Sequence, residues 1–279
     1  MAQCHELLMQ GCAELLSVSP SARLDSELLL AHLLGKDRAG LIAADQEAID
    51  SDLEHRFKEL IAKRKLHVPI AYLVGCKEFY GYDFNITSDV LIPRPETEML
   101  VDMALERSKG FPDPVRLLDL GTGSGCIVVA ICKQLRDQGR LVQAVALDKH
   151  AAALSVAERN IVSYNLQDVI KLQQSDWLSE LKPFADVFDI IVSNPPYVAL
   201  DAEGLSPELK YEPVHALFAK QAGLDDIERI LTHLQAFMDR EGVFLCEIGA
   251  DQGSSVLNLA RNYFPGQDIQ IHHDLAGKA

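Results

Sequence analysis

The sequence lacks the features that mark a secreted, zinc-binding or nucleic-acid-coating protein. None of its six cysteines forms a C-x-x-C pair and no histidine lies at zinc-ligand spacing from them, so we expect reduced thiols and no metal site. Only 26 lysine and arginine residues stand against 41 acidic ones. The resulting net charge of −15 disfavours a broad phosphate-binding surface and attracts basic protein partners.

Targeting signals are also scarce. Residues 1–16 have no basic start and contain Glu6 and Glu14, so we expect neither a signal peptide nor a membrane span, and we expect a cytoplasmic protein. The chain has 279 residues, of which 48% are hydrophobic, and shows no internal repeat. This length allows one large domain with a smaller one beside it.

The first 75 residues have the apolar spacing of helices. Residues 24–35 repeat with a period of 3.6 and end at Gly35, and residues 52–65 place Phe57 and Ile61 on one face. We expect a helical bundle over residues 1–75 whose main role is to recognise a partner. Strand-forming aromatics broken at Gly81 then predict a β-hairpin linker over residues 76–94.

Short apolar strands and amphipathic helices alternate through residues 95–279. This alternation predicts an α/β fold of the Rossmann type, with a mostly parallel sheet covered by helices on both faces. The last expected strand is DIQIHHD, residues 268–274. It contains His272 and His273, for which we expect no metal role because no third ligand accompanies them.

A glycine loop joins the first strand of this region to a helix in LLDLGTGSGCI. Gly121, Gly123 and Gly125 allow a tight turn and a close approach to a ligand at a helix N-terminus. The spacing differs from both the dinucleotide fingerprint and the P-loop. An ordinary strand-to-helix turn is the competing interpretation.

Two further side chains are expected at the same ligand. Asp148 ends the next strand, QAVALD, where a carboxylate can accept both hydroxyls of a ribose. After the third strand, Asp176 could accept from an adenine amino group and Trp177 could stack on the ring, although core packing would equally explain the tryptophan.

The run from Asp119 to Gly125 resembles the D-x-G-x-G-x-G motif of the class I S-adenosylmethionine-dependent methyltransferases. The resemblance implies that S-adenosylmethionine is the cofactor and that the acid after the second strand holds its ribose. The loop residues implied to line the methionine portion are Gly121, Thr122, Gly123, Ser124 and Gly125.

The stretch IVSNPPY follows the fourth strand, where this fold places the reacting methyl group. The Asn194 side-chain oxygen and the Pro195 carbonyl could accept the two N–H groups of a planar –NH2, bonds that strengthen as charge develops on nitrogen. Pro196 fixes the direction of that carbonyl, and Tyr197 could stack on a planar substrate. This segment resembles the motif of enzymes that methylate adenine N6 or glutamine N5, and it does not separate them.

Other stretches resemble the release factor glutamine methyltransferases, the PrmC/HemK family. They are IPRPETE at residues 92–98, LDSELLLAHLLG, PIAYLVGCKEFYGYDFNIT and YEPVHALFA at residues 211–219. The resemblance implies N5-methylation of the glutamine in the Gly-Gly-Gln loop of class I release factors, by a monomer that binds no nucleic acid directly. We also expect Arg94 to pair with Glu98.

The alternatives are an adenine-N6 methyltransferase and an inactive cofactor-binding protein. The second is motivated by the end of the sequence, because relatives usually continue into a final strand resembling DRVLVGR. His215 and Lys220 also depart from the family pattern, which often has arginine and glycine there.

Overall fold

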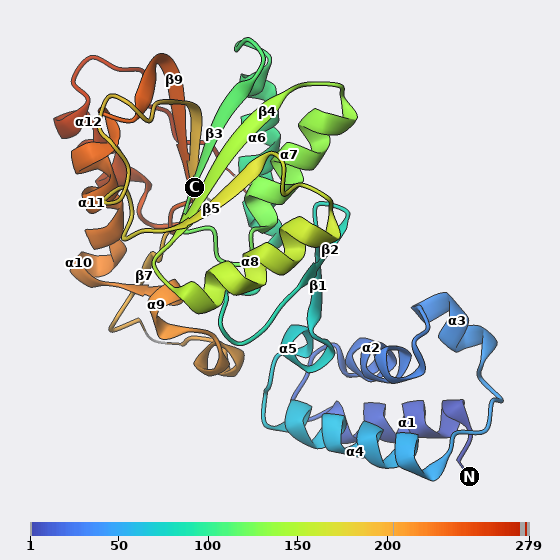
Figure 1. The fold of residues 1–279 in the computed structure, drawn as a ribbon. Helices are drawn as coiled ribbons and strands as arrows, with labels where there is room; N and C mark the ends of the chain where they lie inside the picture. Colours follow the sequence, from blue (N-terminus) through green and yellow to red (C-terminus); the bar gives the residue numbers. More distant parts are fainter. Residues whose placement is uncertain (1, 203, 274–276, 278–279) are drawn as a thin grey trace. The chain divides into compact units, whose positions relative to one another are not determined.

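The computed structural model describes residues 2–202, 204–273 and 277, and these fall into two compact units (Figure 1). The first unit comprises Met1–Cys76 together with Ser206–Tyr211, and the second comprises Lys77–Leu205 and Glu212–Ala279. The second thus begins one residue beyond the expected start of the linker. Residues 206–211 belong to the helical unit although they are far from it in the sequence. No local sequence pattern indicates this.

Helices build the first unit. They are α1 (Cys4–Leu15), α2 (Ala22–Leu34), α3 (Arg38–Ala43), α4 (Ser51–Lys65) and α5 (Ile70–Val74), with the 3-10 turn η2 (Pro207–Tyr211). Helix α2 ends where Gly35 takes a left-handed conformation, as its sequence predicts. Phe57 and Ile61 of α4 are buried in the core that α1, α2 and α4 share.

A buried arginine stabilises this unit. The Arg64 side chain is 5% exposed, and its Nε donates to Asp25 Oδ2 at 2.7 Å. Its Nη1 lies 2.6 Å from Glu208 Oε1, so the cation also holds η2. Ser19 and Ser21 donate to the two oxygens of Asp25, which leaves that buried carboxylate fully paired.

A parallel sheet forms the centre of the second unit, with the strand order β5-β4-β3-β6-β9. Its strands are β3 (Val115–Leu120), β4 (Val142–Asp148), β5 (Ile170–Gln174), β6 (Phe188–Ser193) and β9 (Met238–Cys246). All six residues of β6 are buried, which explains why its sequence is almost continuously apolar. Two small sheets accompany it, formed by β1 (Cys76–Phe79) with β2 (Tyr82–Asn85) and by β7 (Val198–Ala199) with β8 (Phe218–Ala219).

Helices cover both faces of this sheet (Figure 1). On one side lie α6 (Glu98–Ser108), α7 (Cys126–Asp137) and α8 (Ala151–Ser163), and on the other α11 (Asp225–Leu234) and α12 (Gly253–Tyr263). Ile230 and Leu231 of α11 pack in one cluster with Leu118 and Leu147 of the strands. The connecting elements are η1 (Pro95–Thr97), α9 (Val214–Leu217) and α10 (Lys220–Gly223).

The predicted α/β fold with a mostly parallel sheet is confirmed, but the expected last strand is wrong in its described part. Residues 268–273 form no strand, and Asp274 lies outside the described residues. A strand requires a neighbouring backbone to bond, and β6 is the only sheet neighbour of β9 among the residues described. The central sheet therefore has five strands in the described part of the chain.

Replacing the buried arginine tests the first unit. Arg64→Met leaves Asp25 buried without its cation and should destabilise this unit by about 3–5 kcal/mol. Hydrogen exchange of the α1, α2 and α4 amides would measure the loss. Arg56→Met, at an exposed position of the same helix, is the matched control and should change protection little. Equal protection in the two variants would contradict the assigned role.

Candidate active site

The parallel register brings the predicted site residues to one edge of the sheet. Leu120 of β3 is the register partner of Leu147 on one side and of Ser193 on the other. The residues that follow these three positions therefore leave the sheet together. The chain runs from β3 outward to β4 and β5 and then returns to place β6 on the opposite side of β3. Ligands bind at such a switch point in open α/β sheets.

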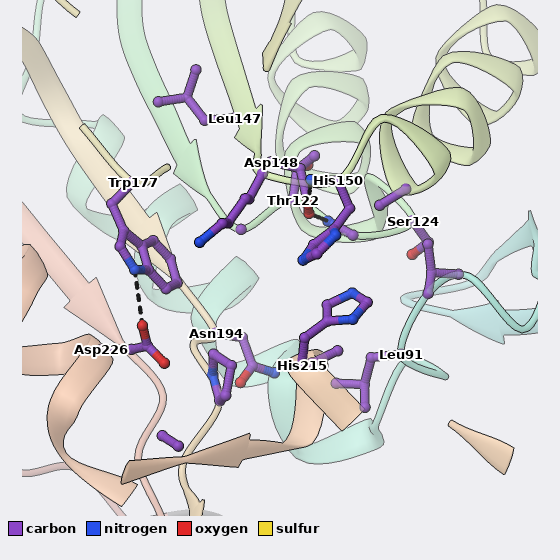
Figure 2. A pocket seen from close by; sticks show the side chains of 18 of the residues that line it. Leu91, Thr122, Ser124, Leu147, Asp148, His150, Trp177, Asn194, His215 and Asp226 are labelled. Atoms are coloured by element: carbon purple, nitrogen blue, oxygen red, sulfur yellow. Dashed lines mark hydrogen bonds between the residues drawn. The ribbon is translucent and has the colours of Figure 1, made fainter. Parts of the chain in front are cut away.

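A cavity of about 370 Å³ lies at this edge (Figure 2). Sequence-predicted residues that line it are Gly121, Thr122, Gly123, Ser124, Asp148, Trp177, Asn194 and Pro196. Gly125, Pro195 and Tyr197 are not among its lining residues. Metal ligands do not gather here, since the described residues contain no group of three or more histidine, cysteine, aspartate or glutamate side chains that could hold an ion.

The glycine loop is built on backbone conformations that favour glycine. Gly121, Gly123 and Gly125 have φ values of +74°, +54° and +79°. A Cβ on Gly121 would lie 3.3 Å from the Trp177 ring, and one on Gly125 would lie 3.3 Å from Ala157 Cβ. Gly125 therefore serves the close packing of α7 against α8, while the first two glycines face the cavity.

Asp148 fixes the loop as well as lining the cavity. Its Oδ2 accepts from the Gly123 amide at 3.0 Å and its Oδ1 accepts from the His150 amide at 2.8 Å. Each carboxylate oxygen has a further lone pair, so both remain able to accept from a diol. The turn after β4 thus holds its carboxylate at a set position in the cavity.

Trp177 lines the same cavity beside Gly121 and has a partner that sequence patterns did not indicate. Its Nε1 donates to Asp226 Oδ1 at 3.0 Å (Figure 2). The adjacent Asp176 is engaged by Lys149 at 3.1 Å and by Arg229 at 2.9 Å. The indole is therefore fixed in orientation, and the Asp176 carboxylate is shared between two cations.

Asn194 is held by a residue that the sequence did not identify. Its Nδ2 donates to Thr97 Oγ1 at 3.1 Å, and Thr97 is only 2% exposed. The amide oxygen is left for a donor in the cavity. Ser193 Oγ donates to the Leu120 carbonyl at 2.9 Å and ties the end of β6 to the start of the glycine loop. A buried threonine before a helix gives no sequence signal of such a role.

The rest of the Asn-Pro-Pro-Tyr segment is anchored by residues that do not line this cavity. Pro195 is buried, and the Tyr197 hydroxyl donates to Glu247 Oε1 at 3.0 Å. Gln252 donates to the Tyr197 carbonyl at 3.0 Å. Burial raises the pKa of Glu247, and the hydrogen bond from Tyr197 opposes part of that rise. These contacts hold the segment in one conformation.

The expected pair between Arg94 and Glu98 is wrong. Arg94 instead binds Glu212, which also accepts from the Ile92 amide at 3.1 Å. Glu98 accepts from the Tyr80 amide at 2.8 Å. Glu212 is buried and needs a cation more than a helix-start glutamate that already has a backbone donor.

Comparison with known proteins agrees with this geometry. The methyltransferase small domain model matches residues 97–216, and the PrmC N-terminal domain model matches residues 6–75. The solved catalytic domain of hMettl16, in complex with MAT2A 3′UTR hairpin 6, shares the fold with a TM-score of 0.54 at 17% identity, over 79% of this chain and 76% of that one. Fold and site together define a class I S-adenosylmethionine-dependent methyltransferase.

Curated relatives extend over both units. One from Burkholderia pseudomallei is 41% identical, over 95% of this chain and 92% of its own length. Another from Bordetella pertussis is 38% identical, over 91% and 92%. Both are named release factor glutamine methyltransferase, and the chain belongs to that family. No helix in the described ranges is long and apolar enough to cross a membrane.

The buried Asp119 gives the site a measurable pH dependence. Burial, reinforced by Asp148, raises the pKa of Asp119 to about 7, while the Thr122 hydroxyl opposes the shift with a 2.7 Å hydrogen bond. Because this pKa is higher in the folded than in the unfolded chain, its stabilising contribution is lost as pH rises from about 4 through about 7.

Asparagine cannot ionise, so Asp119→Asn removes the loss of stability that accompanies ionisation of Asp119. The variant should therefore gain thermal stability relative to the native protein at pH 8, with a smaller difference or a reversal at pH 5. Melting temperatures across this range are the measurement. A difference between the two proteins that does not change with pH would argue against a buried, titrating Asp119.

Proposed function

We propose that the protein transfers a methyl group from S-adenosylmethionine to the N5 amide nitrogen of the glutamine in the Gly-Gly-Gln motif of peptide chain release factors. The observation that carries this proposal is the family relationship over nearly the whole chain, including the helical unit. The cavity supports it, because an amide side chain lies at the switch point where this fold carries out methyl transfer.

The residues present fit the cofactor. Gly121 and Gly123 have no side chains, so a ligand can approach the backbone of the loop closely. Thr122 and Ser124 line the same wall of the cavity. Asp148 would accept from the ribose hydroxyls, and the fixed indole of Trp177 would contact the adenine ring. Gly125 would act through the packing of α7, because it does not face the cavity.

When bound, S-adenosylmethionine supplies an electrophilic methyl group on a sulfonium. The protein's task is then to orient a weakly nucleophilic amide nitrogen. The free oxygen of Asn194 would accept one substrate N–H, and the backbone carbonyl of Pro195 the other. Both bonds strengthen as positive charge develops on nitrogen, so they stabilise the transition state more than the ground state.

Pro196 and Tyr197 would complete the substrate site. Pro196 lines the cavity and limits the conformations of the preceding carbonyl. Tyr197 lines a second cavity together with Glu247, which fixes its hydroxyl, and from there its ring would contact the planar glutamine amide. The buried Thr97 supports this arrangement, because its bond to Nδ2 sets which way the Asn194 oxygen points.

The helical unit is proposed to recognise the release factor. Its match to the PrmC N-terminal domain model and the chain's net charge of −15 favour a protein surface with basic residues over duplex nucleic acid. We propose that the protein acts as a monomer in the cytoplasm.

Labelled methyl transfer tests the substrate. With radiolabelled S-adenosylmethionine, we expect label on a release factor and none on DNA or RNA. A release factor carrying Gln→Ala in its Gly-Gly-Gln motif should stay unlabelled. Transfer to nucleic acid would favour the adenine-N6 alternative, and cofactor binding without turnover on any substrate would favour an inactive binding protein.

Two substitutions separate chemistry from cofactor binding. Asn194→Ala should lower kcat by about 10²-fold or more through loss of a transition-state hydrogen bond, with cofactor affinity nearly unchanged. Asp148→Ala should first raise the cofactor's dissociation constant. Steady-state kinetics and calorimetry measure the two effects, and equal changes in both parameters for both variants would contradict the roles.

A further inference from the structure

We propose that His215 is a positioning residue for cofactor binding: its neutral ring, stacked on His150, helps to hold residues 212–220 as a wall of the cavity, and protonation of His215 loosens that wall. The inference rests on the proposed cofactor site and not on the identity of the methyl acceptor.

The two imidazoles meet across the cavity (Figure 2). Their ring centroids lie 3.5 Å apart with an interplanar angle of 29°, which is a stacked contact. His150 comes from the turn after β4, and its backbone amide donates to Asp148 Oδ1. His215 comes from α9 on the facing wall. The pair therefore connects two segments of chain: the turn that carries Asp148, the proposed acceptor for the ribose hydroxyls, and the segment that contains α9.

Residues 212–220 are anchored to the rest of the unit both before and after His215. Glu212 is buried and binds Arg94 and the Ile92 amide. Phe218 and Ala219 pair with the two residues of β7. Between these anchors α9 has only four residues: Leu217 is buried, and the histidine stack joins His215 to the turn after β4.

The charges around the pair make it sensitive to protonation. His215 is exposed to solvent on one side; partial desolvation within the cavity lowers its pKa, His150 lowers it further, and Asp148 opposes the shift. The other ionisable residues on the cavity walls are Asp89, Arg94, Cys126, Lys149, Asp176, Lys220, Asp225, Asp226 and Arg229. Of these, Lys149 and Arg229 are paired with Asp176, and Arg94 is paired with Glu212.

Because the pKa of His215 is lowered, acidification weakens the stacked state. The stacked state favours the uncharged ring, so it is fully populated well above pH 6.5 and loses stability as pH falls below that value. A charge on the His215 ring is disfavoured by its partial desolvation in this contact. Cofactor affinity should consequently weaken on acidification, because one wall of its cavity is held less firmly.

The test uses the full-length protein without any methyl acceptor. Trp177 is the only tryptophan in the chain and lines the cavity, so its fluorescence can follow titration with S-adenosylhomocysteine. Between pH 8 and pH 5.5 we expect the dissociation constant of the native protein to rise about tenfold. His215→Phe, which keeps an aromatic ring but cannot be protonated, should lose this dependence, whatever its affinity at pH 8.

His233→Phe is the matched control, since His233 is exposed in the last turn of α11, and it should keep the native pH dependence. Melting curves at pH 8 establish that each variant is folded. A pH dependence that persists in His215→Phe would assign the titration to another group, such as Asp119, and overturn the proposal. The proposal would also be overturned if the affinity of the native protein for S-adenosylhomocysteine were constant from pH 8 to pH 5.5. Failure to methylate a release factor would leave this result unaffected.

Discussion

The alignment of strand ends across β4, β3 and β6 is the constraint on which the site depends. Parallel pairing puts Leu147, Leu120 and Ser193 in register, so the glycine loop, Asp148 and Asn194 all emerge at one edge. The residues that follow each strand are then free to be polar, while the strands themselves remain buried and mostly apolar, with Asp119 and Asp189 as buried exceptions. A one-residue slip of β6 would reverse the direction of its side chains and take Asn194 out of the cavity.

Support for the Asn194 side chain comes from outside the strands. Thr97 stands before α6, and Glu247 and Gln252 follow β9. Each contributes a single hydrogen bond to the Asn-Pro-Pro-Tyr segment, and together they fix both its side chains and its backbone. This arrangement explains how a loop with two prolines and no regular hydrogen bonding can hold an amide in a set direction.

The sequence predicts the parts of the site that depend on local chemistry. The glycine spacing, the carboxylate that ends β4 and the position of Asn194 could be identified because backbone conformation and strand periodicity determine them. Thr97, Asp226 and Glu247 could not, since their partners lie 49 to 97 residues away. The same reason accounts for the wrong pairing of Arg94, whose partner Glu212 is 118 residues distant. The strand expected at residues 268–274 failed because periodicity does not supply a neighbouring backbone.

The return of residues 206–211 to the helical unit has a topological consequence. The polypeptide passes between the two units three times, at residues 76–77, 205–206 and 211–212. A fragment that stops at Cys76 would omit Glu208 and leave the buried guanidinium of Arg64 without one of its two counter-ions. The helical unit is thus not a detachable appendage: during synthesis it reaches its final set of ion pairs only after the first four strands of the central sheet have been made.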